Sequence, residues 1–222
     1  MTNPVKRQYD STRRVQLAGE TRELIARAAH DLFVTRGYGR TTIRDVAGAA
    51  GVAVETVYAK FGTKATLLRQ AWFVTFRGDD SDIPLYDRPE MQAVLAIPDL
   101  AERTRAHAAF VAARNQRSAP LLHAIEGAAA SEPAAAQMLA EFAERRLDVA
   151  TRYAASAAAT GQLAISEADA RDILYATMDG ALWMRLVVQR GWAPEHYTRW
   201  LADLWLNQFV HHQRQEPQAQ TS

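Results

Sequence analysis

The chain has 222 residues, of which 48% are hydrophobic and 23% charged, as in an ordinary soluble globular protein. It contains no cysteine, which excludes disulfides, thiolate metal sites and a cysteine nucleophile and fits a reducing compartment. The net charge of +1 conceals an asymmetry: residues 1–78 carry 13 Lys and Arg against 6 Asp and Glu, whereas residues 79–222 carry 13 against 19. A basic first third suits an anionic partner, although charge alone does not separate this from chance clustering of solvated charges.

No part of the sequence predicts a membrane or export segment. The first twenty residues lack the uninterrupted apolar region of a secretion signal. No segment has the charge-free apolar length of a membrane span. We therefore expect a soluble, cytoplasmic protein.

In chain order, the first predicted helix covers residues 22–37. Its apolar residues recur at helical spacing, and Gly37 is a natural C-terminal stop. The face expected to be buried consists of Leu24, Ile25, Ala28, Ala29, Leu32 and Phe33. The eighteen or so residues before this helix are predicted to be disordered.

Three more helices follow before residue 78. Thr42 has Asp45 three residues later, which is the spacing of a capping box, and begins the second helix. The third covers about 54–61 and the fourth about 64–78. The buried face of the second helix is predicted to be Ile43, Val46, Ala47 and Ala50.

Beyond residue 78 the sequence predicts a linker rich in turn residues and acids, followed by alanine-rich helices. No alternation typical of strands is present, so the predicted fold class is all-α with about nine helices. The later helices are expected at about 99–117, 120–129, 133–159, 167–190 and 195–210.

The third helix has two distinct faces when its residues are placed at about 100° intervals. The inward face is formed by Val54, Val57 and Phe61. The outward face carries the small or polar residues Glu55, Thr56 and Ala59, flanked by Tyr58 and Lys60. Such a face, edged by side chains that can reach phosphates, suits the DNA major groove.

The junction before this helix supports the same reading. Gly51 permits the left-handed turn between two crossed helices, so residues 42–61 predict a helix-turn-helix whose second helix reads bases. Thr42 and Lys64 begin helices, and helix N-termini attract phosphate oxygens. The alternative is an ordinary αα-hairpin in a bundle, and the basic excess of residues 1–78 favours DNA binding over it.

The run TTIRDVAGAAGVAVETVYAKFGTKATLL, residues 41–68, resembles the DNA-binding segment of TetR-type (TetR/AcrR) transcriptional regulators. The segment LFVTRGY just upstream fits the same family, and the resemblance covers about residues 20–70. It implies that Thr42, Tyr58 and Lys64 hold phosphates and that the outward face of the third helix reads bases. The DNA-binding residues expected are Thr42, Arg44, Ala53, Glu55, Thr56, Tyr58, Ala59, Lys60 and Lys64.

Two positions depart from the usual pattern of the family. Ala53 stands where a capping serine is common, so the third helix should be less well anchored. Lys60 stands where a histidine or tyrosine is usual, and its ammonium can meet a phosphate only as a point charge. Glu55 either accepts from a cytosine amino group or discourages a nearby phosphate, and the sequence leaves both open.

The resemblance also implies a homodimer whose last two helices pair into a four-helix bundle. These helices are broadly apolar, and the alternative is a core hairpin buried within one chain. A two-fold dimer would place its recognition helices about 34–36 Å apart on a near-palindromic operator. The expected interface residues are Leu174, Met178, Ala181, Leu182, Leu186, Leu201, Leu204, Trp205 and Phe209.

The C-terminal domain of the family binds a small-molecule effector, so polar and aromatic residues on apolar helices are pocket candidates. Each of them could equally be an ordinary core or surface residue. The aromatic residues among these candidates favour a hydrophobic or aromatic effector. The candidates are His107, Phe110, Arg114, Tyr153, Tyr175, Asp179 and Trp183.

The resulting prediction is a repressor dimer that leaves its double-stranded operator when an effector shifts the fourth helix, with no cofactor, metal or enzymatic activity. The alternatives are a DNA-binding architectural dimer that senses nothing, and an all-α enzyme with a metal at Asp79, Asp80 and Asp82. The domains expected are an arm (1–18), a helix-turn-helix domain (19–78), a linker (79–98), an effector and dimerisation domain (99–211) and a disordered tail (212–222).

Overall fold

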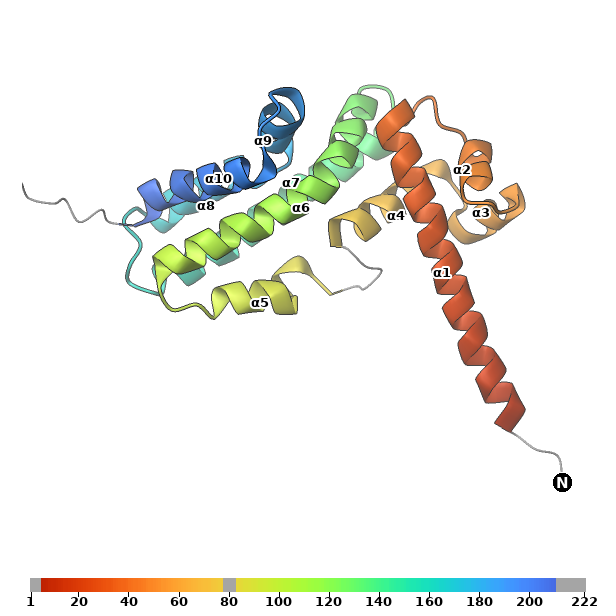
Figure 1. The fold of residues 1–222 in the computed structure, drawn as a ribbon, viewed down its shortest axis with the longest axis horizontal. Coiled ribbons are helices and arrows are strands. Elements are labelled where there is room, and N and C mark those ends of the chain that lie inside the picture. Colours follow the sequence, from red (N-terminus) through yellow and green to blue (C-terminus); the bar gives the residue numbers. More distant parts are fainter. Residues whose placement is uncertain (1–4, 78–82, 211–222) are drawn as a thin grey trace, which may run out of the picture. The chain divides into compact units, whose positions relative to one another are not determined.

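The computed structural model describes residues 5–77 and 83–210. In this part of the chain it contains ten α-helices and one isolated β-bridge, between Leu163 and Val210, and no strand. The predicted all-α class is therefore confirmed (Figure 1). The chain divides into two compact units, which we call unit one (residues 1–82 and 116–142) and unit two (residues 83–115 and 143–222).

Each unit is built from its own helices and from parts of two long ones. Unit one has α1 (Val5–Arg36), α2 (Ile43–Ala49), α3 (Val54–Phe61) and α4 (Lys64–Arg77). Unit two has the 3-10 turn η1 (Leu85–Asp87), α5 (Pro89–Leu95), α8 (Glu167–Thr177), α9 (Ala181–Trp183), the π-helical segment η2 (Met184–Gln189) and α10 (Pro194–Phe209). Residues of α6 (Leu100–Ala129) and α7 (Pro133–Ala158) belong to both units.

The core of unit one is apolar and joins all four of its first helices. Ile25 and Phe33 of α1, Val57 of α3 and Leu67 of α4 are fully buried. The predicted buried face of α2 is confirmed, since all four of its residues are buried. Burial on this scale stabilises each large side chain by roughly 1.5–3 kcal/mol. These contacts fix the helix-turn-helix in place.

The N-terminal region differs from the prediction in two ways. Helix α1 begins at Val5, so the disordered arm predicted through residue 18 is wrong for the described residues. Leu24, predicted to be buried, is 50% exposed, whereas Ile25 is fully buried. Leu24 lies about 100° around the helix from Ile25, at the edge of the apolar stripe.

The predicted linker 79–98 also carries regular structure. Residues 78–82 lie outside the described part, and the remainder forms η1 and α5. Pro89 occupies the first turn of α5, where a missing N–H costs no helical hydrogen bond. Tyr86 ties this segment to α7, because its hydroxyl donates to the Arg152 carbonyl at 3.2 Å and its ring lies under the Arg152 guanidinium.

Two expected helix boundaries are wrong, and each has a tertiary reason. The helices predicted at 99–117 and 120–129 form one helix, α6, which passes through Pro120. Ala119 and Leu121 on either side are buried, and this packing holds the helix together despite the lost hydrogen bond. The helix predicted at 167–190 is interrupted at 178–180, between α8 and α9.

None of the helices in the described residues is long and apolar enough to cross a membrane. The predicted tail, residues 212–222, lies outside the part of the chain that the structure describes.

Candidate DNA-binding surface and effector site

Helix α2 begins with the capping box that the sequence predicts. The Asp45 N–H donates to Thr42 Oγ1 at 3.1 Å, and the Thr42 N–H donates to Asp45 Oδ2 at 2.8 Å. The Thr42 hydroxyl also donates to Asp45 Oδ2, at 2.6 Å. These hydrogen bonds lower the pKa of the Asp45 carboxyl. Because Asp45 occupies both donors of Thr42, Thr42 can hold a phosphate only by giving up one of these bonds.

The turn between α2 and α3 has the geometry that its sequence requires. Gly51 has φ +64°, in the left-handed region that glycine adopts without strain. Helix α3 then begins after Ala53, which makes no side-chain capping hydrogen bond, as its methyl group predicts. Residues 43–61 therefore form a helix-turn-helix.

The two faces of α3 are arranged as predicted. Val57 and Phe61 are buried, and Val54 packs against the same core. Tyr58 is 53% exposed, so its ring and hydroxyl are available to a partner. The predicted DNA-binding residues are exposed at Thr42, Arg44, Ala53, Glu55, Tyr58 and Ala59, and partly exposed at Thr56, Lys60 and Lys64. Their contacts with DNA remain predictions.

Lys64 begins α4, as predicted, and is held by an aromatic ring that sequence reasoning missed. Its Nζ lies 4.0 Å from the centroid of the Tyr38 ring, a cation–π contact. Burial lowers the pKa of Lys64, and the Glu132 carboxylate opposes this. The ring positions the ammonium beside the N-terminus of α4. The GYG sequence around Tyr38 is the signal that could have revealed this support.

Helix α4 is anchored at its start and along its length. Thr63 caps it, because the Thr66 N–H donates to Thr63 Oγ1 at 3.1 Å. Further along, Arg69 forms a two-pronged ion pair with Glu141 of α7. One turn later the ring of Trp72 stacks on that of Phe142, with centroids 4.4 Å apart. The interactions hold α4 firmly within unit one, between the helix-turn-helix and α7.

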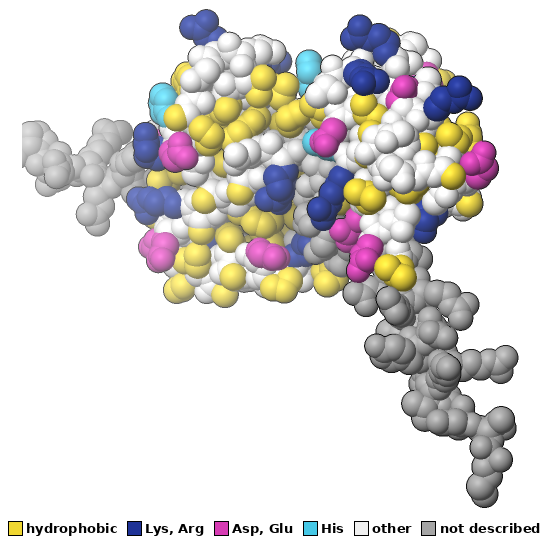
Figure 2. Space-filling view, turned by 45° about the vertical axis from the view of Figure 1, so that its right-hand side comes forward, with side chains coloured by type: hydrophobic (Ala, Val, Ile, Leu, Met, Phe, Trp, Pro, Cys, Tyr) yellow, Lys and Arg dark blue, Asp and Glu magenta, His cyan; other side chains and the backbone are white. Residues whose placement is uncertain are grey.

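The visible surface does not separate into fields of one charge sign. On the face that Figure 2 shows, the coloured Lys and Arg side chains alternate with Asp and Glu. The Lys and Arg side chains that are coloured on this face therefore form no single basic patch.

The predicted effector residues all lie in unit two, where the structure brings them into two groups. The first is a buried aromatic stack. The His107 ring of α6 lies between Tyr153 of α7, at 3.9 Å between centroids, and Trp205 of α10, at 5.2 Å. Burial, with a further contribution from the Arg114 charge, lowers the pKa of His107 to about 3, so its ring is neutral at physiological pH.

This stack contains polar atoms that the described residues do not satisfy. His107 Nδ1, Tyr153 Oη and Thr104 Oγ1 are buried and make no hydrogen bond of ordinary length and angle, although the Thr104 hydroxyl lies near enough to Tyr153 Oη to act on its pKa as a weak hydrogen-bond partner. Each such atom costs roughly 1–3 kcal/mol if nothing meets it. Burial raises the pKa of Tyr153, and the nearby Thr104 hydroxyl opposes the rise.

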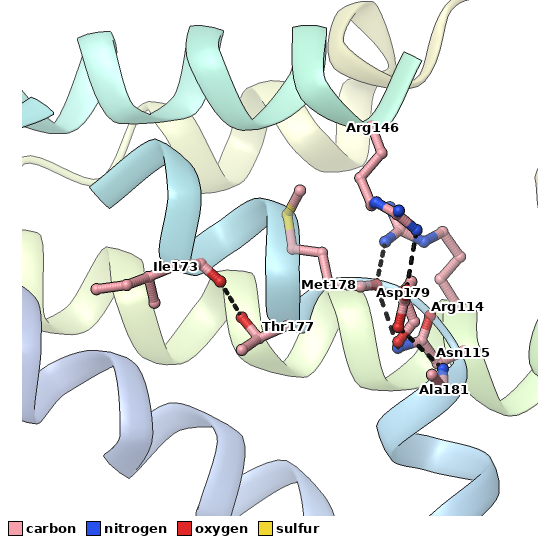
Figure 3. Close-up of polar contacts among 8 residues, drawn as sticks. All are labelled: Arg114, Asn115, Arg146, Ile173, Thr177, Met178, Asp179 and Ala181. Carbon is pink, nitrogen blue, oxygen red and sulfur yellow. Dashed lines mark hydrogen bonds and ion pairs between the residues drawn. The ribbon is translucent and has the colours of Figure 1, made fainter. Parts of the chain in front are cut away.

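The second group surrounds the break between α8 and α9 (Figure 3). Asn115 donates to the carbonyls of Met178 and Asp179 at 3.3 and 3.0 Å, and Arg114 donates to the Met178 carbonyl at 3.2 Å. Arg146 of α7 pairs with the Asp179 carboxylate at 3.0 Å. The same carboxylate accepts from the Ala181 N–H at 3.0 Å and so caps α9. Long-range partners therefore satisfy the backbone groups that the interruption exposes.

The remaining effector candidates make ring contacts beside these two groups. The Arg146 guanidinium lies 4.5 Å from the centroid of the Tyr175 ring, and that of Arg114 lies 5.9 Å from Phe110. Trp183 is buried and meets the edge of the Tyr197 ring at 5.1 Å. Whether any of them touches an effector remains a prediction.

Sequence reasoning missed several residues of this interior, namely Thr104, Asn115, Arg146 and Tyr197. Thr104 and Asn115 recur with His107 at helical spacing along α6, which is the signal that could have found them. Arg146 and Tyr197 come from other helices, and their proximity follows only from the tertiary fold.

The predicted dimer interface needs a correction. Within one chain the interior already buries Leu174, Met178, Leu201, Trp205 and Phe209, each at most 1% exposed. Trp205 also donates its indole N–H to Thr177 at 2.8 Å. These five are core residues, because a side chain without exposed surface cannot meet a partner as it stands. The partly exposed interface candidates are Ala181, Leu182, Leu186 and Leu204.

Within the described residues, no group of three or more His, Asp or Glu side chains is placed to hold a metal ion. The acidic residues Asp79, Asp80 and Asp82 lie outside the described part of the chain.

Comparison with known proteins agrees with the helix-turn-helix that the structure shows. The sequence model of the tetR family of bacterial regulatory proteins matches residues 25–71, which span the helix-turn-helix. No sequence among the curated proteins matches the chain.

Solved structures share the fold over nearly their whole length. A TetR-family transcriptional regulator from Mesorhizobium loti is 19% identical, with a TM-score of 0.66 over 87% of this chain and 98% of that one. NalD from Pseudomonas aeruginosa, a secondary repressor of a multidrug efflux pump, is 18% identical, with a TM-score of 0.61 over 87% and 98%. SmeT in complex with triclosan is 21% identical, with a TM-score of 0.63 over 91% and 98%.

The chain therefore has an all-α fold that contains a helix-turn-helix. Residues 25–71 are similar to the tetR family of bacterial regulatory proteins, as the resemblance of residues 41–68 implies, and the chain shares its fold with the Mesorhizobium loti regulator.

Proposed function

We propose that the protein is a repressor that binds a near-palindromic operator as a homodimer and leaves it when a hydrophobic or aromatic effector enters unit two. The observation that carries the proposal is the exposed face of α3. It presents Glu55, Tyr58 and Ala59 outward from a helix that Val57 and Phe61 fix in the core. A helix held in this way can lie in the major groove with its small and polar residues against base edges.

A response to an effector is supported by the interior of unit two. Native cores satisfy most of their buried polar groups, so a cluster of unsatisfied ones at one point calls for an explanation. Unit two buries the polar atoms of Thr104, His107 and Tyr153 without partners. SmeT binds triclosan and NalD is a repressor, and by analogy we propose both properties for this chain.

The effector must prefer the dimer that cannot bind DNA, because a ligand with equal affinity for both forms shifts nothing. We propose that it acts through α6 and α7, since residues of both helices belong to unit two and to unit one. In unit one, α7 holds α4 through the Arg69–Glu141 ion pair. A change in α7 would then alter the position of α4 and of the helix-turn-helix.

In vitro selection of bound fragments from random double-stranded DNA tests this proposal. We expect an enriched near-palindrome whose half-sites are about one helical turn apart. Thr56→Ala should change the preferred bases, because Thr56 lies on the reading face. Enrichment of no sequence would reject operator binding, and an unchanged preference in the variant would show that α3 is not the reading helix.

A further inference from the structure

Three unpartnered polar atoms of unit two lie in one place. Thr104 and His107 are three residues apart on the same face of α6, and Tyr153 faces them from α7. All three residues are at most 1% exposed. The Thr104 hydroxyl lies near enough to Tyr153 Oη to lower its pKa as a weak hydrogen-bond partner, and the His107 and Tyr153 rings stack at 3.9 Å. The interior thus gathers two hydroxyls and one imidazole nitrogen that make no hydrogen bond of ordinary length and angle.

The same unit satisfies comparable groups nearby. Arg103 donates to the Ile97 carbonyl at 2.7 Å and to Ser156, and Asn115 donates to two backbone carbonyls. The fold therefore supplies partners for several buried polar side chains close to the stack. Buried polar atoms left without partners at one point need a different explanation, and a bound molecule with a polar group supplies it.

We propose, as a refinement that rests on the proposed function, that Thr104, His107 and Tyr153 form the hydrogen-bonding end of the effector site and that the effector is an uncharged aromatic molecule with a hydroxyl group. His107 already stacks on Tyr153 at 3.9 Å and lies 5.2 Å from Trp205, and an aromatic ligand that displaces Trp205 from His107 would stack in the same way. A hydroxyl both donates and accepts, as the two protein hydroxyls and the imidazole require.

The local charges favour this class over ionic ligands. Two guanidinium groups act on the stack, Arg114 on His107 and Arg103 on Tyr153, so a cationic ligand is repelled. Both guanidinium groups already donate to backbone carbonyls. A carboxylate would lose its hydration on entering this fully buried stack, which costs more than burying a hydroxyl. His107 stays neutral, which suits a neutral ligand.

The site also contacts the helix break. Trp205 forms one wall of the stack, and its indole N–H donates to the hydroxyl of Thr177, the last residue of α8. A ligand ring that displaces Trp205 would disturb this bond beside the break at residues 178–180. The effector site is thereby connected to α9 and η2, which carry predicted interface residues.

The test is equilibrium dialysis of the full chain against four probes that share a ring and differ in one group. The probes are 4-ethylphenol, ethylbenzene, 4-ethylbenzoate and 4-ethylbenzylammonium, together with their two-ring counterparts. We expect the phenols to bind about tenfold more tightly than the hydrocarbons, which is the contribution of one or two net hydrogen bonds. The benzoates and the ammonium compounds should bind more weakly than the phenols.

Variants locate the binding. Tyr153→Phe and Thr104→Val each remove one unpartnered hydroxyl with little change of shape, so both should fold, and each should lower the preference for phenol over hydrocarbon several-fold. His107→Phe should do the same. Tyr197→Phe is the matched control, because its hydroxyl is also buried without a hydrogen bond of ordinary geometry but its ring packs on Trp183 and not in the stack.

Three results would overturn the inference: no probe binds, an ionic probe binds as tightly as the phenol, or the three variants keep the full preference for phenol. Binding of the selected operator by the same preparations is measured in parallel, without any probe. Operator binding with failed probe binding rejects the effector class alone, whereas loss of operator binding rejects the proposed function.

Discussion

Unit one and unit two are built from the same kind of helix but differ in what fills their interiors. Unit one packs an apolar cluster around Phe33, Val57 and Leu67, and its capping groups are satisfied within a few residues. Unit two buries Thr104, His107 and Tyr153 among its apolar residues, and each has a polar atom without a hydrogen bond of ordinary geometry. Within its described residues, unit one leaves such atoms only on the partly exposed Arg22 and His30. An apolar core gives one well-defined arrangement, whereas a partly satisfied polar interior can change when a ligand enters. The contrast suits a rigid reading unit and a responsive sensing unit.

The largest expected effect breaks the apolar core of unit one. Phe61→Ala should lower the free energy of unfolding by about 3–5 kcal/mol, because it removes a buried ring and leaves a cavity. Chemical denaturation followed by circular dichroism measures this. Tyr58→Ala, on the exposed side of the same helix, is the control and should change stability by less than about 0.5 kcal/mol. Similar losses in both variants would contradict the assignment of the two faces.

The next effect concerns the helix break of unit two. Arg146→Met should lower the free energy of unfolding by about 1–3 kcal/mol, since it leaves the mostly covered Asp179 carboxylate without its ion pair. This range is below that for a fully buried pair because solvent still reaches both side chains. Arg27→Met breaks the exposed pair with Glu23 and should change stability by less than about 0.5 kcal/mol. Equal losses of stability in the two variants would mean that the Arg146–Asp179 ion pair does not stabilise the break between α8 and α9.

A third prediction tests whether only unit one contacts DNA. Lys64→Ala should weaken binding to all DNA sequences alike and reduce the slope of log affinity against log salt by about 0.9, as expected for one lost phosphate contact. Lys60→Ala should act in the same direction. Fluorescence anisotropy of labelled fragments over a salt series measures the slope. Arg190→Ala, an exposed basic residue of unit two, should leave the slope unchanged, and an equal change there would remove the distinction between the units.

Ala53→Ser should raise the free energy of unfolding by about 0.5–1 kcal/mol. The residue before α3 makes no side-chain capping bond, and a serine there can accept from the N–H groups of the first turn. Thermal unfolding should show a higher Tm than for the parent protein. An unchanged Tm with weaker operator binding would show that the alanine serves DNA contact and not helix stability.

The smallest effect concerns the unpartnered hydroxyls of unit two. Tyr197→Phe should change the free energy of unfolding by less than about 1 kcal/mol in either direction, because the buried hydroxyl makes no hydrogen bond of ordinary geometry and has only the Asn115 side chain as a weak partner. Burial raises the pKa of this hydroxyl to about 12, so it stays protonated. A loss above about 2 kcal/mol would show that the hydroxyl is satisfied, and the contrast between the two interiors would weaken.

Unit one could be predicted closely because its signals are local. The capping box of Thr42 and Asp45, the left-handed Gly51 and the apolar spacing of α2 and α3 each act within four residues, and the structure contains all of them. Leu24 was wrongly predicted to be buried, because the spacing of apolar residues shows that α1 has an apolar stripe but does not show where that stripe ends. That edge is set by where α1 packs against α2 and α4.

In unit two the sequence determined the helical class and most helix starts, such as the Ser166 cap of α8 and the Asp99 cap of α6. Only the tertiary structure decided where helices continue and break. Helix α6 passes Pro120, in its unit-one part, because buried neighbours hold it. In unit two the chain leaves the helix between α8 and α9, where Arg114, Asn115 and Arg146 satisfy the exposed backbone and the Asp179 side chain. The same holds for the site at His107, whose ring meets Tyr153 and Trp205 from helices distant in sequence. Periodicity along one helix carries no information about which other helix will face it, so these contacts could come only from the packing.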